Sequence, residues 1–284
     1  LILFDAYVHG DIDRRGFLER ASRFAVGGMT AAGLLAALSP DFASAQVVPR
    51  DDARLQVATE EVSSPSGHGT IKVYVAKPAA APAKLPGVMV VHENRGLNPH
   101  IEDVTRRLAL EGFVAFAPDA LTPLGGYPGD EDRARALFAQ LDQSKTRQDF
   151  LAAADVLQKR PDGTGRMGVV GFCYGGGIAH MLSTQRADLA AAVPFYGNHP
   201  PVEDAARVRA PLMIHFADVD ERINAAWPAY SAALQSAGVA YTSHRYPGTQ
   251  HGFHNDTTPR FDAAAAKLAW ERTLRFFRQH LPPA

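Results

Sequence analysis

The chain contains a single cysteine and no excess of charge of either sign. Because Cys173 is the only cysteine among 284 residues, an intramolecular disulfide and a zinc site made of cysteines are both excluded. Lysine and arginine number 29 and aspartate and glutamate 30, which gives a formal net charge of -1. Such a chain has no long-range field to attract nucleic acid or an anionic membrane. We therefore expect a small-molecule partner and no nucleic acid.

Long hydrophobic runs are also missing. The most apolar N-terminal stretch, residues 24–38, holds about 15 residues, whereas a membrane-spanning helix needs about 20. It follows Arg14 and Arg15 and precedes small residues at 43–45 that suit a cleavage site, a pattern that resembles a twin-arginine signal. We interpret residues 1–45 as a signal segment, which predicts export to the periplasm and no stable membrane span. The alternative is an amphipathic helix that is retained in a cytoplasmic protein.

Strand and helix patterns alternate from residue 46 onward. The expected strands are residues 55–62, 70–76, 87–92, 113–117, 167–170, 189–195, 211–216 and 241–246. The expected helices are residues 101–112, 131–141, 146–159, 178–185, 225–237 and 262–280, and residues 121–130 are expected to form a loop over a cleft. The first two strands suggest a hairpin at a sheet edge. The later alternation predicts that residues 46–284 form one α/β domain, with a mainly parallel sheet of about eight strands and helices on both faces.

The stretch Gly171–Gly177 places the single cysteine at a sharp turn between a strand and a helix. Glycines at 171, 175 and 176 remove side chains that would collide where the strand and the helix approach each other. The pattern G-x-C-x-G-G is that of the nucleophile elbow of α/β hydrolases, with Cys173 in the place of serine. It predicts an α/β-hydrolase fold; the alternative is a glycine-rich turn around a buried structural cysteine.

A cysteine nucleophile needs a base, and the base needs a group that orients it. In α/β hydrolases the chain order is nucleophile, acid and histidine, and two later loops supply that order here. Asp220 follows one expected strand and His251 follows the next, so both fall at the edge of the sheet where parallel strands end. We predict a triad of Cys173, His251 and Asp220, with His254 and Asp218 as competing candidates.

Several spaced motifs together resemble the dienelactone hydrolase (carboxymethylenebutenolidase) family over residues 55–280. They are His92–Asn98 after the third strand, Ala117-Pro118-Asp119, Gly171–Gly176, Asp220 and His251-Gly252-Phe253. The resemblance implies an α/β hydrolase that cleaves an ester or a lactone. No cofactor is expected. No metal site is expected either, because His92, Glu93 and His100 lack the H-E-x-x-H spacing of a zinc-binding helix.

The resemblance also implies a second carboxylate near the thiol. In the family this glutamate, here Glu93, takes the thiol proton when substrate binds; the alternative is a structural ion pair of Glu93 with Arg95 or Arg106. The backbone N–H groups of Tyr174 and Asn94 are the expected oxyanion hole, since donors at these positions face the developing negative charge.

Substrate-binding residues are less well defined by the sequence. The characterised family type holds the substrate carboxylate with arginines, one of them four residues after the catalytic histidine, where this chain has Asn255. The candidates for the missing carboxylate-binding arginine are Arg95, Arg133 and Arg135. The alternative is that these are solvated surface arginines. Aromatic candidates for an acyl pocket are Phe172, Tyr174, Tyr127 and Phe253, each of which could equally belong to the core.

Taken together, the sequence predicts hydrolysis of a carboxylic ester or lactone through a thioester acyl-enzyme. Two other classes of protein remain as alternatives. One is a non-catalytic exported protein that binds ligands on the same fold. The other is a redox-responsive thiol protein, in which Cys173 reacts with oxidants rather than esters.

Overall fold

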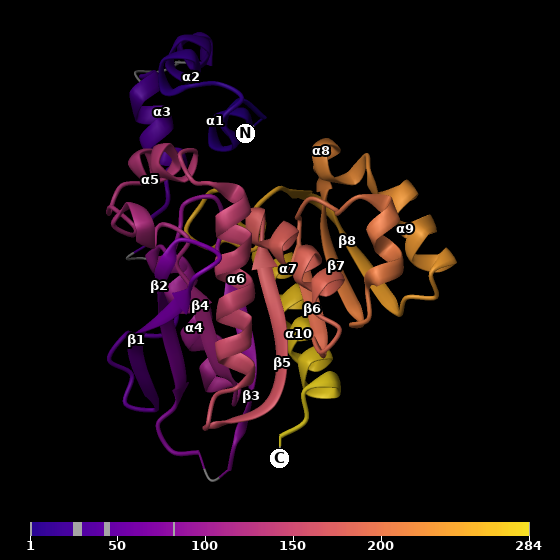
Figure 1. The fold of residues 1–284 in the computed structure, drawn as a ribbon. Helices are drawn as coiled ribbons and strands as arrows, with labels where there is room; N and C mark the ends of the chain where they lie inside the picture. Colours follow the sequence, from indigo (N-terminus) through magenta and orange to yellow (C-terminus); the bar gives the residue numbers. More distant parts are fainter. Residues whose placement is uncertain (1, 25–29, 43–45, 82, 284) are drawn as a thin grey trace.

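In the computed structural model, which describes residues 2–24, 30–42, 46–81 and 83–283, eight strands form one sheet (Figure 1). The strands are β1 (Leu55–Ser64), β2 (Gly69–Pro78), β3 (Leu85–Val91), β4 (Val114–Pro118), β5 (Gly163–Phe172), β6 (Ala191–Phe195), β7 (Leu212–Val219) and β8 (Tyr241–Gln250). Their order is β1-β2-β4-β3-β5-β6-β7-β8. The pairs β1–β2 and β2–β4 are antiparallel and the others parallel, which confirms the predicted edge hairpin and the mainly parallel sheet.

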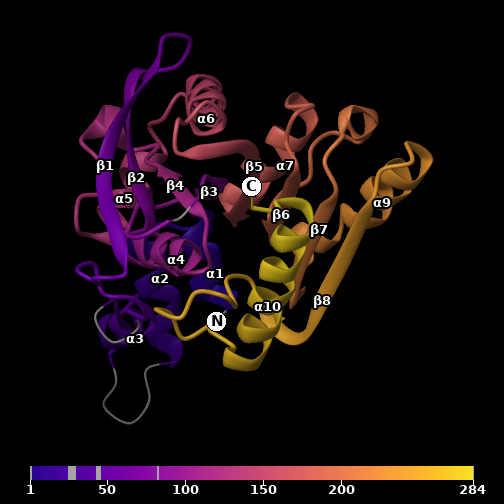
Figure 2. The same cartoon turned by 90° about the horizontal axis from the view of Figure 1, so that it is seen from below.

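Helices cover both faces of this sheet, as predicted. In the main domain they are α4 (Pro99–Leu110), α5 (Glu131–Phe138), α6 (Gln143–Gln158), α7 (Tyr174–Gln185), α8 (Glu221–Asn224), α9 (Trp227–Ser236) and α10 (Ala263–His280). Residues of α6, α7 and α9 belong to one core cluster and residues of α4 and α10 to the other. Figure 2 shows these two sets on opposite sides of the strands.

The central strands have apolar sequences without interruption because both of their faces are covered. Along β3, Met89 and Val91 lie in the core on the α6 side, whereas Val88 and Val90 lie in the core on the α4 side. Successive side chains of a strand point to opposite faces, so a strand covered on both faces needs apolar residues at every position. The same geometry brings the ends of β5, β7 and β8, and the loops that follow them, to one edge of the sheet.

Some element boundaries differ from the sequence expectation. The strand expected at 167–170 begins at Gly163, and the loop expected at 121–130 contains a short 3-10 helix at Thr122–Leu124. The helix expected at 225–237 is α9, Trp227–Ser236, and the short helix α8 before it was not predicted. Pro228 lies in the first turn of α9, where its missing N–H group leaves no intrahelical hydrogen bond unmade, so it favours a helix start at this point.

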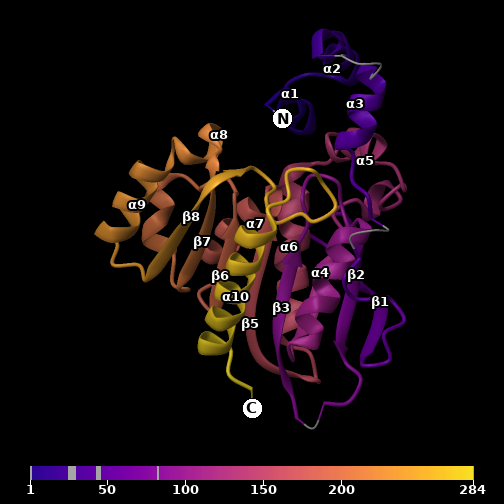
Figure 3. The ribbon, with the colours of Figure 1, turned by 180° about the vertical axis from the view of Figure 1, so that it is seen from behind.

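The N-terminal segment forms helices of its own, α1 (Ile2–His9), α2 (Arg14–Ala21) and α3 (Ala31–Leu38), with a 3-10 turn at Ser22–Phe24. Phe4, Tyr7, Phe17, Ala21 and Leu35 make a small separate core among them. Figures 1 and 3 show this segment beyond the ends of the strands, next to α5. The predicted cleavage site at 43–45 and part of the apolar stretch, residues 25–29, lie outside the described residues. Within the described part of the chain, no helix combines the length and the apolar character needed to cross a membrane.

Candidate active site

Cys173 occupies the turn between β5 and α7 in a strained backbone conformation. Its φ is 55° and its ψ is -112°, a region that residues with a Cβ atom rarely adopt, and its side chain is 9% exposed. A strained nucleophile at the apex of such a turn is the geometry of a nucleophile elbow.

The glycines around this turn are required by close backbone contacts. A Cβ atom on Gly171 would lie 1.9 Å from the carbonyl oxygen of Gly175, and one on Gly175 would lie 2.2 Å from that of Val91. A Cβ atom on Gly176 would lie 2.6 Å from the carbonyl oxygen of Phe195. These contacts are shorter than any side chain tolerates, so the predicted reason for the three glycines is correct.

His251 and Asp220 form a buried pair next to the elbow. Asp220 follows β7 directly and His251 follows β8, and the distance from His251 Nδ1 to Asp220 Oδ2 is 2.6 Å. Burial disfavours the charged imidazole, but the negative charge of Cys173 and hydrogen bonds with Asp220 and Cys173 outweigh it, so the pKa of His251 is raised. Cys173 and His251 also line one cavity, so the three side chains lie together.

The two competing candidates lie elsewhere. Asp218 accepts a hydrogen bond from the backbone N–H of Gly248 at 3.1 Å. The ring of His254 stacks on Phe172 with centroids 5.1 Å apart, and burial lowers the pKa of His254 to about 3. A histidine in such surroundings stays neutral, so the structure pairs His251, and not His254, with an acid.

Glu93 lies in the same pocket and is held by Asn255. The Asn255 Nδ2 atom donates a hydrogen bond of 2.9 Å to Glu93 Oε2, while Thr257 donates from its backbone N–H and its hydroxyl to Asn255 Oδ1. Because both Thr257 donors face the amide oxygen, the amide nitrogen must point to Glu93. Asn255, which was predicted as a substrate-binding position, lines the cavity with Cys173, and its amide also positions Glu93.

The backbone around Glu93 and Asn94 is fixed by a buried histidine. The Nδ1 atom of His92 lies 2.6 Å from the carbonyl oxygen of Glu93, and its Nε2 accepts a hydrogen bond from the backbone N–H of Ala120. Asn94 and Cys173 line the same cavity. Tyr174 is the first residue of α7, where backbone N–H groups have no acceptor within the helix.

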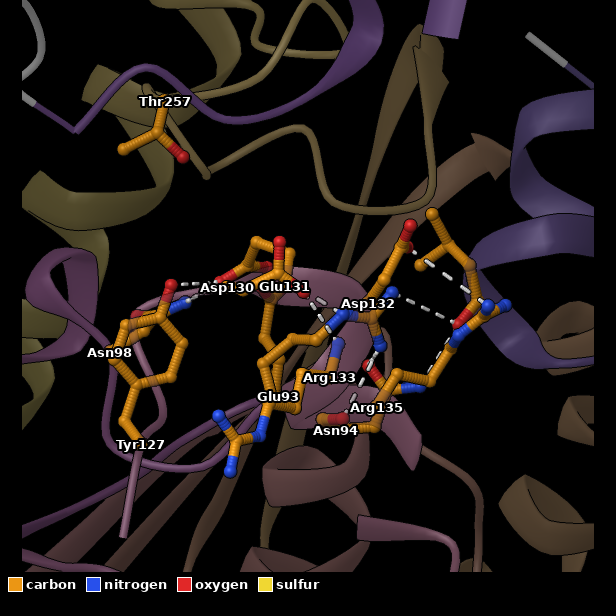
Figure 4. Close-up of polar contacts among 12 residues, drawn as sticks. Glu93, Asn94, Asn98, Tyr127, Asp130, Glu131, Asp132, Arg133, Arg135 and Thr257 are labelled. Carbon is orange, nitrogen blue, oxygen red and sulfur yellow. Dashed lines mark hydrogen bonds and ion pairs between the residues drawn. The ribbon is translucent and has the colours of Figure 1, made fainter. Parts of the chain in front are cut away.

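The three predicted arginines lie in different surroundings. Arg95 is buried, lines the cavity, and has its Nε 3.5 Å from a carboxylate oxygen of Glu131. Arg135 donates to the carbonyl oxygen of Tyr7, whereas the side chain of Arg133 is exposed. Figure 4 shows this cluster of charged groups at the start of α5.

Two further arginines, Arg106 and Arg260, lie where the sequence did not place them. Arg106, proposed as a partner of Glu93, instead donates to the hydroxyl of Tyr74 at 2.7 Å and to the carbonyl oxygen of Val48. Arg260 was missed, although it lines the cavity with Cys173 and is 5% exposed. Only its position nine residues after His251 hinted at a place in this loop, and spacing of that length fixes no geometry.

Two of the four predicted aromatic residues lie in the core rather than in a pocket. Phe172 and Phe253 are 1% and 0% exposed and pack in the core. The Tyr127 hydroxyl donates to Glu131 at 2.9 Å, as Asn98 also does at 3.4 Å (Figure 4). Tyr174 alone keeps a face toward a groove beside Cys173.

Open space reaches Cys173 from two sides. On the side of Glu93 and Arg260 the cavity measures only about 40 Å³. On the side of α7 a groove of about 430 Å³ is lined by Tyr174, Ile178, Met181, Asn198 and His199, among others. The groove residues on and after β6 were not predicted, since nothing in their sequence marks them as part of a site. Among the described residues, no group of three or more His, Cys, Asp or Glu side chains could hold a metal ion.

A strained elbow at the carboxyl edge of a mainly parallel sheet, with an acid and a histidine from the next two loops, defines the class of α/β hydrolases. Residues 71–281, well over half of the chain, match the Dienelactone hydrolase family, and the chain belongs to that family. It is therefore a hydrolase that acts on carboxylic esters or lactones. Residues 1–26 separately match a family described as YqhI-like.

Known proteins resemble the chain over most of its length. A "Putative carboxymethylenebutenolidase" of Escherichia coli O157:H7 is 32% identical over 263 residues, which cover 87% of this chain and 95% of that protein. A "Putative hydrolase fragment YghX" of Escherichia coli K12 is 48% identical over 114 residues, 40% of this chain and 97% of that protein. The crystal structure of a "Putative Dienelactone Hydrolase" from Klebsiella pneumoniae subsp. pneumoniae MGH 78578 matches with a TM-score of 0.70 and 29% identity, over 79% of this chain and 99% of that chain. The predicted fold is confirmed.

Proposed function

We propose that the protein hydrolyses its ester or lactone through a thioester formed on Cys173, with His251 as base and Asp220 as the group that orients His251. One observation carries the proposal. The imidazole of His251 contacts Asp220 through Nδ1 at 2.6 Å and lines the same cavity as Cys173, so an imidazole oriented by an acid shares one site with the thiol.

The reaction follows from this arrangement. The Cys173 sulfur attacks the carbonyl carbon, and the resulting oxyanion is stabilised by the backbone N–H groups of Tyr174 and Asn94, worth about 3 kcal/mol for each donor. The carbon–oxygen bond to the leaving group breaks as His251, which enters the cycle protonated, gives its proton to the alkoxide. Water then attacks the thioester while His251 takes a proton from it. The carbon–sulfur bond breaks to release the acid, and Glu93 returns the proton it took, which restores the thiol.

Glu93 is the proposed acceptor for the thiol proton at the start of the cycle. Its presence in the cavity that Cys173 also lines supports this role. Its hydrogen-bond donor, Asn255, is a neutral amide, so the carboxylate has no ion pair with this position to give up before it can accept a proton. We therefore propose that Glu93 can act with esters that carry no acidic group of their own.

Export through a twin-arginine signal stays a prediction that rests on Arg14 and Arg15. The packing of α1 and α2 does not test export, because the contacts described are those of the chain before any cleavage. Locating the protein in fractionated cells, with an Arg14→Lys, Arg15→Lys double variant as the control, tests it. Loss of periplasmic protein in that variant is the expected result, and an equal distribution of both proteins contradicts the prediction.

The test of the proposed chemistry is burst kinetics with p-nitrophenyl acetate and with a dienelactone. We expect a burst of p-nitrophenol in the parent protein and none in Cys173→Ala. Asp218→Asn is the matched control for Asp220→Asn, since both remove one carboxylate from the same loop. A burst that persists in Cys173→Ala, or equal losses in the two Asp variants, would contradict the triad.

A further inference from the structure

The C-terminal end of α1 lies against the active site. The carbonyl oxygen of Val8 accepts hydrogen bonds from Asn94 Nδ2 at 3.2 Å and from Arg95 Nη2 at 3.3 Å. The carbonyl oxygen of Tyr7 accepts one from Arg135, whose guanidinium carbon also lies 4.1 Å from the centre of the Tyr7 ring. The last carbonyls of a helix carry its negative partial charge, so α1 presents the arginines with an acceptor surface.

A second contact reaches the loop of the catalytic histidine. Asp5 of α1 has its Oδ1 atom 2.9 Å from Arg260 Nη1. The Arg260 guanidinium lies over Gly252, where a Cβ atom would be 3.1 Å from Nη2, and Gly252 directly follows His251. The carboxylate of Asp5 therefore pairs with the guanidinium that packs against Gly252, the residue after His251.

Further contacts anchor the segment as a folded unit. The hydroxyl of Tyr7 and the guanidinium of Arg14 both bind Asp132 at the start of α5. After α3, the backbone N–H of Asp41 donates to the carbonyl oxygen of Thr257 at 2.8 Å. The segment also has its own apolar core, so it docks as a small structure rather than as a loose tail.

The space left beneath it is too small for a substrate. Phe4, Tyr7 and Val8 share the lining of the cavity with Cys173 and His251, and the cavity measures about 40 Å³. That volume suits about one water molecule, whereas sites for small organic ligands occupy roughly 300–1,000 Å³. A ligand can enter this side of the site only if α1 moves away.

We propose that residues 2–24 are an inhibitory cap that competes with ligands carrying a carboxylate group. The Asp5 carboxylate and the carbonyl oxygens of Tyr7 and Val8 take the positions on Arg260, Arg135 and Arg95 that such a group would take. The inference rests on the proposed function only in identifying Cys173 as the reactive thiol. If residues 1–45 are removed as a signal segment, the cap leaves with them and the acid-binding side of the site opens.

The single cysteine provides a direct readout of the cap. The readout is the rate of Cys173 alkylation by iodoacetate, which carries a carboxylate, relative to that by iodoacetamide, which can also enter through the α7 groove. Both are followed by intact mass on the full chain and need no turnover. Tyr7→Ala removes the ring from Arg135 without changing charge, and we expect about a ten-fold faster alkylation as the open population rises. Phe24→Ala is the control, because Phe24 belongs to the same segment and is 61% exposed; its rate should equal that of the parent. Asp5→Asn, a milder change, should give a smaller increase.

Competition with benzoate tests the carboxylate. Benzoate should slow alkylation strongly in Tyr7→Ala, weakly in the parent, and not in Tyr7→Ala combined with Arg260→Gln. Equal alkylation rates in the parent, Tyr7→Ala and Asp5→Asn would overturn the cap, and a Tyr7→Ala protein that ignores benzoate would overturn the competition. If alkylation responds as expected but no variant forms an acyl-enzyme, the proposed function fails while the cap stands.

Discussion

Asn255 and Glu93 are joined by a hydrogen bond of 2.9 Å from an amide nitrogen to a carboxylate oxygen. The family type has an arginine at the position of Asn255, so this chain has a neutral donor where a cation is expected. Thr257 fixes the amide from the other side with two hydrogen bonds. The carboxylate is thus oriented without being neutralised by an ion pair at this position.

Asn255→Arg should slow the acylation of Cys173 by uncharged esters. A guanidinium at this place would stabilise the Glu93 carboxylate and make it a poorer acceptor for the thiol proton. If the change from a neutral to a charged hydrogen bond adds about 1.4 kcal/mol, the rate falls about ten-fold. Single-turnover acylation by p-nitrophenyl acetate measures it, with Asn255→Gln as the neutral control. A faster reaction in Asn255→Arg would show that Glu93 does not accept the proton.

Gly175→Ala should disrupt the elbow, whereas Gly177→Ala should be tolerated. A methyl group on Gly175 would lie 2.2 Å from the carbonyl oxygen of Val91, which is part of the rigid strand β3. A methyl group on Gly177 would meet atoms of Asn198 at 3.6 Å, an ordinary contact. We expect a loss of about 3 kcal/mol or more in unfolding free energy for the first and less than about 1 kcal/mol for the second. Urea unfolding of both variants decides, and similar stabilities would contradict the close packing.

The contribution of His251 to the stability of the protein should fall as pH rises through its folded pKa, whereas buried histidines with a lowered pKa, such as His180 and His215, contribute the opposite slope below about pH 7.5. The folded pKa of His251 is raised above the unfolded value of about 6.5, so its stabilising contribution is complete below about pH 6.5 and is lost at higher pH. Asp220→Asn removes one of the interactions that raise the pKa and should move this loss to lower pH. Melting temperatures between about pH 6 and pH 9 follow the effect.

His254 gives a matched control for that titration. Its pKa is lowered to about 3, so it is neutral throughout this range. His254→Gln can lower the melting temperature through lost packing on Phe172, but above about pH 7.5, where His254 is neutral in the unfolded chain as well, the slope with pH should equal that of the parent. A changed slope in His254→Gln together with an unchanged slope in Asp220→Asn would show that the titrating group is His254 and not His251.

The fold and the triad candidates could be predicted because they depend on local sequence. The elbow is encoded in seven consecutive residues, Gly171–Gly177, and Asp220 and His251 were found from their places after successive strands. Parallel strands end at one edge of a sheet, so the order along the chain was enough to bring these residues together. The edge hairpin was visible from the turn-rich loop between β1 and β2.

Contacts between distant segments could not be predicted. Asp5 and Arg260 are 255 positions apart, and no pattern in the sequence pairs them. Phe253 was predicted to line an acyl pocket, but two residues beyond His251 the chain has already returned to the core. The packing of α1 over the site depends on a tertiary contact rather than on local preference. The arginines and the apolar stretch that follow α1 predict a signal segment, and that stays a prediction.

The central claim, a thioester on Cys173, is tested most directly by trapping it. The parent protein is mixed with p-nitrophenyl acetate, quenched in acid within the burst, digested, and the peptide that contains Gly171–Gly177 is sequenced by mass spectrometry. The account predicts one acetyl group on Cys173 that hydroxylamine removes, and none on this peptide in Cys173→Ala. An acetyl group on another residue, with product released at the parent's rate by Cys173→Ala, would contradict it.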